Sequence, residues 1–125
     1  MADLEALLAD LNRSKTLVLT HYGRKSGKPY EVRIWFTVDG DHVNLQTMNM
    51  KRQWTQNVVA NGKVSLRIGS TVLDGEATQV VDGAEMARVA ELLGKKYLVA
   101  RPYLWIKKRP HGAFHAKVSV RGKAS

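Results

Sequence analysis

The chain has 125 residues, no cysteine and a formal net charge of +9. This length predicts a single domain over residues 1–125, large enough to bury about two-thirds of its surface. The lack of cysteine excludes disulfides, thiol catalysis and cysteine-ligated metal centres. No apolar run approaches the roughly 18 residues of a membrane span, and the N-terminus does not resemble a secretory signal. A cytoplasmic protein is therefore expected.

The positive charge is concentrated at one end of the sequence. All 11 acidic residues fall before residue 92, whereas 9 of the 20 Lys and Arg residues lie in residues 92–125. A segment with basic residues and no acid predicts a positive surface suited to phosphates, nucleic acid or an anionic membrane.

The first elements in chain order are a helix and a hairpin. Leucines at positions 4, 7, 8 and 11 have helical spacing and predict an amphipathic helix over about residues 3–12. Two apolar runs follow, residues 16–20 and 32–38, and the turn between them carries a glycine near each end. This pattern predicts a β-hairpin. Trp35 falls on the polar face of the second run and either packs there or lines a ligand cleft.

The hairpin turn is unusually cationic, because Arg24, Lys25 and Lys28 lie within five residues. Gly23 and Gly27 allow positive φ angles, and a hydroxyl lies between them on Ser26. Such a turn can hold an anion between backbone amides and basic side chains. The alternative is an ordinary solvated hairpin tip.

A third strand and a helix are predicted next. The turn at residues 39–41 leads into a strand ending at Thr47, which would complete a three-stranded meander. Asn49 is the expected N-cap of a helix that ends before Asn61. Lys51 and Arg52 would then lie in the first helical turn, where the helix dipole disfavours cations. A bound anion would relieve this conflict, whereas the alternative is tolerated surface charge.

The remaining pattern predicts three more strands and one more helix. The strands cover residues 64–68, 71–81 and 114–120, with a bulge at Gly75, and a helix begins at an Asp82 cap. The fold class is therefore mainly β (α+β), a six-stranded antiparallel barrel with three flanking helices.

The sequence contains none of the common catalytic motifs. It has no Gly-x-Gly-x-x-Gly or phosphate-binding P-loop, and no nucleophile elbow. His111 and His115 lie on a turn and a strand without a nearby acid, so no metal site is expected. If the protein is an enzyme, a cofactor is expected to carry the chemistry.

Two stretches resemble a known family. Residues 19–29, LTHYGRKSGKP, and residues 47–61, which end in VVAN, resemble the deazaflavin (coenzyme F420)-dependent nitroreductases and quinone reductases. The resemblance extends over about residues 14–120. It implies a split β-barrel related to the FMN-binding pyridoxamine-phosphate oxidases, and a homodimer.

The resemblance also implies the cofactor and its site. The cofactor would be coenzyme F420, an 8-hydroxy-5-deazaflavin with an anionic phospholactyl-oligoglutamate tail. The implied cofactor-binding residues are Arg24, Lys25, Ser26, Gly27 and Lys28 for the tail, and Thr47, Met48, Asn49, Lys51, Arg52, Trp54 and Asn57 around the ring and its linker. The loop at residues 48–51 departs from the Ser-Lys-Gly-Gly-like loop that is common in the family.

The implied activity is hydride transfer from the reduced deazaflavin to a small hydrophobic electrophile, a quinone, an enone or a nitroaromatic. Tyr97 and Tyr103 would be the catalytic residues, and a packing role is their alternative. An FMN-binding reductase with the same fold is the nearest rival. Rivals of another class are a nucleic-acid-binding barrel, which the resemblance disfavours, and a carrier that contacts anionic membranes through the basic face.

Overall fold

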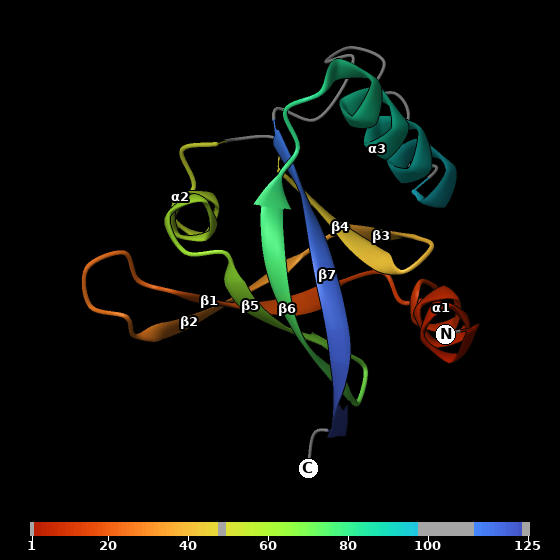
Figure 1. Cartoon of the computed structure of the whole chain (residues 1–125), viewed down its shortest axis with the longest axis horizontal. Coiled ribbons are helices and arrows are strands. Elements are labelled where there is room, and N and C mark those ends of the chain that lie inside the picture. The colour runs from red at the N-terminus through yellow and green to blue at the C-terminus, as the bar shows by residue number, and fades with distance from the viewer. Residues whose placement is uncertain (1, 48–49, 98–111, 124–125) are drawn as a thin grey trace.

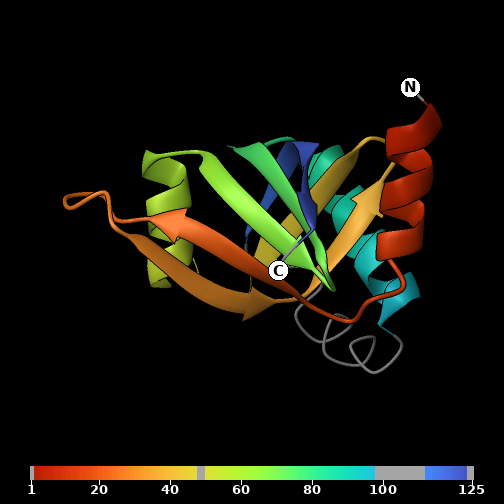
Figure 2. The ribbon, with the colours of Figure 1, turned by 90° about the horizontal axis from the view of Figure 1, so that it is seen from below.

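The computed structural model describes residues 2–47, 50–97 and 112–123. These residues form one antiparallel sheet that curls into a half-barrel, together with three helices (Figures 1 and 2). The elements run α1 (Ala2–Leu11), β1 (Leu17–Tyr22), β2 (Pro29–Ile34), β3 (Phe36–Asp39), β4 (His42–Thr47), α2 (Gln53–Ala60), β5 (Lys63–Ile68), β6 (Thr71–Gln79), α3 (Gly83–Lys96) and β7 (Gly112–Lys123). The mainly β class with three helices is confirmed.

The sheet has seven strands instead of six, because the predicted strand over residues 32–38 is two strands. It breaks at Trp35, between β2 and β3. The sheet order is β2-β1-β5-β6-β7-β4-β3, so these two consecutive strands form the opposite edges of the sheet. The predicted three-stranded meander is therefore wrong. The chain instead passes at Trp35 from one edge strand of the sheet to the other, so the two edges of the curled sheet are joined there.

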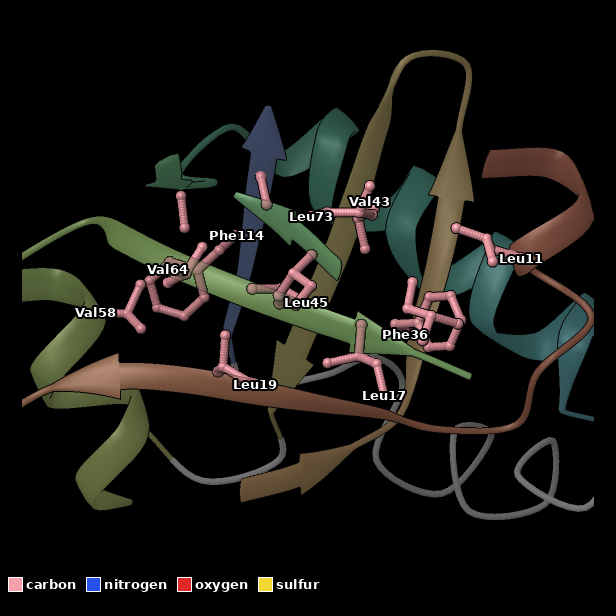
Figure 3. Close-up of a cluster of buried hydrophobic side chains, with 14 of the residues drawn as sticks. Leu11, Leu17, Leu19, Phe36, Val43, Leu45, Val58, Val64, Leu73 and Phe114 are labelled. Atoms are coloured by element: carbon pink, nitrogen blue, oxygen red, sulfur yellow. The ribbon is translucent and has the colours of Figure 1, made fainter. Parts of the chain in front are cut away.

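The core fills the concave side of the curled sheet (Figure 3). Phe36 and Phe114 are completely buried there, among buried leucines and valines from β1, β4, β5 and β6. Val58 from α2 packs against one end of this cluster, and Leu8 and Leu11 from α1 pack against it as well. The predicted amphipathic helix near the N-terminus is thus confirmed.

The boundaries of α2 and α3 test the predicted caps. Asp82 caps α3, since its carboxylate accepts a hydrogen bond of 3.0 Å from the Glu85 N–H, as predicted. The predicted Asn49 cap of α2 is wrong, because the helix begins at Gln53 and its N-cap residue is Arg52, in extended conformation without a side-chain cap. The Thr55 hydroxyl lies 2.9 Å from the Met50 carbonyl and 2.7 Å from the Arg52 carbonyl, which fixes the turn before the helix.

The predicted bulge at Gly75 is also misplaced. Gly75 pairs regularly with β5 and β7, and the register shift in β6 lies between Val72 and Leu73. Gly75 instead allows β6 to lie close to β7. A Cβ atom at this position would come within 2.8 Å of the Lys117 carbonyl oxygen on β7.

Candidate functional site

The basic turn is a hairpin tip that is closed by its own hydrogen bonds. The Gly23 N–H donates to the Lys28 carbonyl at 2.9 Å, and the Gly27 N–H donates back to the Gly23 carbonyl at 3.0 Å. Gly27 has a φ of 71°, which favours glycine. The Ser26 hydroxyl accepts from the Lys28 N–H at 3.2 Å. These bonds hold the turn, and the side chains of Arg24, Lys25 and Lys28 at its tip all belong to exposed residues.

Asn57 on α2 connects the hairpin tip to the body of the protein. Its Oδ1 accepts a hydrogen bond of 2.9 Å from the Arg24 guanidinium. Its Nδ2 lies 3.0 Å from His21 Nδ1 on β1. Asn57 and His21 are 1% and 3% exposed, so this polar chain is desolvated at its inner end. One arginine of the tip is thereby held in a fixed direction against α2.

The chain of donors determines the tautomer of His21. A guanidinium only donates hydrogen bonds, so the Asn57 oxygen faces Arg24 and the Asn57 amide group faces His21. His21 Nδ1 must therefore accept, and the ring proton resides on Nε2. Burial lowers the pKa of His21 below its ordinary value of 6.5, which favours the same neutral form. The ring also stacks on Tyr30, its cross-strand neighbour, at 5.9 Å between centroids.

A pocket of about 440 Å³ lies between the edge strand β2 and the end of β4, next to the start of α2. Its wall combines aromatic and aliphatic groups with two guanidinium groups. The lining residues are Thr16, Val32, Arg33, Ile34, Trp35, Gln46, Thr47, Arg52, Trp54 and Leu93. The volume falls within the range of about 300–1,000 Å³ that is typical of small-molecule sites.

Gln46 is the most unusual residue of this pocket. It is 7% exposed, and among the described residues neither its Oε1 nor its Nε2 has a hydrogen-bond partner. Burial of an amide without partners is unfavourable. Both polar atoms are enclosed in the wall and have almost no accessible surface.

The wall at Trp35 is fixed by the end of α3. The Trp35 indole lies parallel to the Tyr97 ring, with centroids 4.3 Å apart and an angle of 5° between the planes. The Tyr97 hydroxyl donates to the main-chain carbonyls of Lys15 or Phe36 and lies 3.3 Å from the Phe36 N–H. Lys96 donates to the same Phe36 carbonyl at 2.9 Å, and burial lowers the pKa of Lys96 to about 8. These contacts hold the chain where it crosses between the two sheet edges.

The structure brings together most of the site residues that the sequence suggested. Thr47, Arg52 and Trp54 line the pocket, and the basic tip is connected to them through Asn57. Lys51 lies on the exposed surface just before α2 rather than in its first turn. Met48, Asn49 and Tyr103 lie outside the described residues. Sequence reasoning missed Gln46 and Arg33, because both read as solvent-facing positions of alternating strands.

The distance from the pocket to the tip suits an elongated anionic molecule. Arg52 and Asn57 are five residues apart on or beside α2, which corresponds to about 8 Å along a helix. Val32 on β2 and Lys28, just before the start of β2, are four residues apart, or roughly 13 Å along a strand. Basic side chains thus occur at the pocket, part-way along and at the tip.

Comparison with known families identifies the family to which the chain belongs. A family model described as F420H(2)-dependent quinone reductase matches residues 5–103. The chain belongs to this family. Its cofactor is coenzyme F420, and it is an F420-dependent oxidoreductase. No match was found among the curated proteins.

Solved structures share the fold of this F420-dependent oxidoreductase. A conserved hypothetical protein of Mycobacterium tuberculosis superimposes with a TM-score of 0.72 at 21% identity, over 96% of this chain and 82% of the other. A structure described as an F420-H2 dependent reductase superimposes with a TM-score of 0.67 at 24% identity, over 82% of this chain and 93% of the other. A structure described as a putative pyridoxamine 5′-phosphate oxidase of Listeria innocua superimposes with a TM-score of 0.62 at 19% identity, over 94% of this chain and 93% of the other. At these identities the likenesses establish the split-barrel fold alone.

The residues of the pocket fit a deazaflavin. The two tryptophans that line it suit a flat aromatic ring, and the exposed basic side chains of the tip suit an anionic tail. Among the described residues, no cluster of three or more His, Asp or Glu side chains is arranged to hold a metal ion. Of the described helices, none is both long and apolar enough to cross a bilayer.

Proposed function

We propose that the protein transfers a hydride from reduced coenzyme F420 to a small hydrophobic electrophile, a quinone, an enone or a nitroaromatic. The observation that supports this is the Arg24–Asn57 hydrogen bond, which joins the basic tip to the helix that begins at the pocket. The quinone class agrees with the description of the family. The three acceptor classes share an electron-poor π-system that gains negative charge on oxygen when it is reduced.

The proposed cofactor site divides into a tail region and a ring region. Arg24, Lys25 and Lys28 would bind the anionic tail, with the hydroxyl of Ser26 as a further donor, and Gly27 would set the turn. Thr47, Arg52 and Trp54 would contact the ring and its linker, and Asn57 would position Arg24. Met48, Asn49 and Lys51 complete the proposed ring loop.

The chain contributes orientation, exclusion of water and charge stabilisation. When bound and reduced, the deazaflavin supplies a hydride from its C5 atom. The apolar wall of Val32, Ile34 and Trp54 would keep water from the ring face. The guanidinium groups of Arg33 and Arg52 would stabilise the negative charge that develops on the acceptor oxygen.

The sequence analysis predicted that Tyr97 and Tyr103 are the catalytic residues. The Tyr97 hydroxyl bonds to main-chain groups, and its ring supports Trp35. We therefore propose a positioning role for Tyr97, through the pocket wall at Trp35. Tyr103 stays the candidate proton donor.

A turnover assay tests the proposed function. The purified protein is mixed with reduced coenzyme F420 and a panel of menadione, cyclohexenone and a nitroimidazole, and the return of the oxidised deazaflavin absorbance is followed. We expect oxidation that depends on both protein and acceptor, and a strong loss of rate in Arg52→Ala. Gln79→Ala, at an exposed site on β6, is the matched control. Absence of acceptor-dependent oxidation would contradict the proposal, and reaction with reduced FMN alone would favour the FMN-dependent alternative.

The homodimer and the cellular location stand as part of this proposal. The family resemblance supports a homodimer, and Trp35, next to the pocket, is 39% exposed and apolar. The proposed cytoplasmic location rests on the composition of the sequence. Light scattering that gives twice the chain mass would agree with the dimer, and a clean monomer would contradict it. Flotation with anionic vesicles tests the alternative of membrane contact through the basic face.

A further inference from the structure

Lys96, in the last turn of α3, carries a half-buried charge that the proposed mechanism does not use. Its ammonium donates a hydrogen bond of 2.9 Å to the Phe36 carbonyl and lies 3.4 Å from the centroid of the Phe36 ring. The Tyr97 ring is 5.2 Å from the same ammonium. No carboxylate among the described residues forms an ion pair with it, since Glu91 on the same helix is paired with Lys95 at 3.1 Å. Partial burial of an ammonium without a carboxylate costs free energy, so the contacts with Phe36 are what hold it there.

The Tyr97 hydroxyl shows why a second donor is needed at Phe36. This hydroxyl lies within hydrogen-bond distance of the Lys15 and Phe36 carbonyls, and it has one proton to donate. Lys96 satisfies the Phe36 carbonyl and thereby leaves the Tyr97 proton for Lys15. The end of α3 therefore binds the main chain at two places, just before β1 and at the start of β3.

Both of these main-chain positions adjoin the pocket. Thr16 directly follows Lys15, Trp35 directly precedes Phe36, and Thr16 and Trp35 both line the pocket. We call these two residues the clamped wall. A shift of the main chain at either position would move one of the two side chains, so the bonds from the end of α3 set the separation of Thr16 and Trp35.

We propose that Lys96 is a positioning residue for the acceptor, which binds against the clamped wall that Lys96 holds in place through Phe36. Lys96 is not among the residues that line the pocket, so it acts through the main chain. This inference rests on the proposed function, in which residues from the end of β4 and the start of α2 contact the cofactor ring and leave the clamped wall to the acceptor.

Steady-state kinetics separate this role from a general loss of stability. Lys96→Met removes the donor and the charge but keeps most of the aliphatic side chain. We expect its KM for menadione to rise about fivefold or more, while kcat at saturating menadione stays within about twofold of the wild type. The dissociation constants of coenzyme F420 and of its tail-less deazaflavin chromophore should not change. Lys96→Arg keeps a charged donor and should restore most of the affinity for menadione.

The adjacent Lys95 provides the matched control. It is exposed and paired with Glu91, and it makes no contact with Phe36. Lys95→Met removes the same charge from the same turn of α3, so we expect its KM for menadione to equal that of the wild type. All kinetic measurements are made well below the melting temperature of each variant, so that unfolding does not contribute to the change.

Two signals in nuclear magnetic resonance spectra of the free protein test the clamp without turnover. In the wild type, the ring current of Phe36 should shift the ε-methylene protons of Lys96 upfield. This signal needs no variant, so it does not depend on the folding of Lys96→Met. The indole N–H signal of Trp35, assigned by its loss in Trp35→Phe, should move in Lys96→Met and keep its position in Lys95→Met.

The outcomes separate this inference from the proposed function. Unshifted Lys96 protons, an unmoved Trp35 signal in Lys96→Met, or an unchanged KM for menadione in that variant would overturn the role of Lys96 and leave the proposed function standing. An equal loss of affinity for the cofactor and for menadione would overturn it as well, because it would indicate general loosening. If the wild type oxidises reduced coenzyme F420 with no acceptor, the proposed function fails, and the positioning of the acceptor fails with it.

Discussion

Arg24 and Asn57 are joined by a hydrogen bond of 2.9 Å although 33 positions separate them in the sequence. The bond ties the basic hairpin tip to α2, whose first turn lies beside the pocket. Because Asn57 also contacts His21, the position of a surface arginine depends on a buried polar chain. If the tip binds the cofactor tail as proposed, stability and cofactor binding are coupled at Asn57.

Substitution of Asn57 tests this coupling. Asn57→Leu leaves His21 Nδ1 buried without a donor, so we expect the free energy of unfolding to fall by about 1–3 kcal/mol. The affinity for coenzyme F420 should fall as well, because Arg24 loses its anchor. Denaturant unfolding and a binding titration measure the two effects. Asn57→Asp keeps an acceptor for Arg24 and should retain more affinity than Asn57→Leu; equal affinities of the two variants would argue against the anchoring role.

The basic tip should affect binding of the tail more than folding. Arg24→Ala combined with Lys25→Ala removes two exposed cations and also the donor to Asn57 Oδ1, so we expect the free energy of unfolding to fall by about 1 kcal/mol. The affinity for intact coenzyme F420 should fall at least tenfold and become less sensitive to salt. The tail-less chromophore is the internal control, since its affinity should not change. An unchanged dissociation constant for the intact cofactor would place the tail elsewhere.

We expect Tyr97 to hold the pocket wall in place rather than to donate a proton to the substrate. Tyr97→Phe keeps the stack on Trp35 but removes the hydroxyl that bonds to the main chain of Lys15 and Phe36. We expect a loss of about 1–2 kcal/mol in the free energy of unfolding and a similar kcat at saturating substrate. Steady-state kinetics and denaturant unfolding distinguish a structural role of Tyr97 from a role as proton donor. A large loss of kcat in a fully stable variant would restore Tyr97 as a proton donor.

The stability should fall on mild acidification. Burial lowers the pKa of His21 below 6.5 in the folded protein, so the unfolded chain binds more protons in the window just below that pH. Stability is therefore full above pH 6.5 and is lost as the pH falls through the folded pKa. Protonation of Nδ1 would also place a second donor against the Asn57 amide.

His115 titrates in the same direction, since burial and the nearby His42 lower its pKa, with partial opposition from Glu85 and Asp39. Unfolding measured between about pH 5 and pH 8 in the wild type, His21→Gln and His115→Gln separates the two contributions. Each variant should show a shallower loss than the wild type. A slope that neither substitution changes would contradict this origin.

Much of the fold could be predicted from local patterns, and the error at Trp35 shows where they stop. The apolar alternation of residues 32–38 continues through the break, so it predicts one strand. The break depends on distant residues, because Lys96 and Tyr97 bind the Phe36 carbonyl and fix the crossing between the sheet edges. Local sequence has no signal for such contacts.

The basic hairpin tip of the candidate site could be located from the sequence, because charge and glycine spacing alone define it. Three cations in a glycine-bracketed turn predict an anion site without knowledge of the fold. The pocket was not predictable in the same way, since Gln46 alternates with His42 and Asn44 and resembles an ordinary solvent face. Its burial arises from tertiary packing beside Trp35 and Leu93, which line the same pocket.

The most direct test of the proposed cofactor site is a parallel fluorescence titration of the purified protein with coenzyme F420 and with FMN, at low and at moderate salt. We expect micromolar or tighter binding of coenzyme F420, weaker binding of FMN, and an advantage for coenzyme F420 that shrinks as salt screens its tail. Tighter binding of FMN, or no binding of either cofactor, would contradict it.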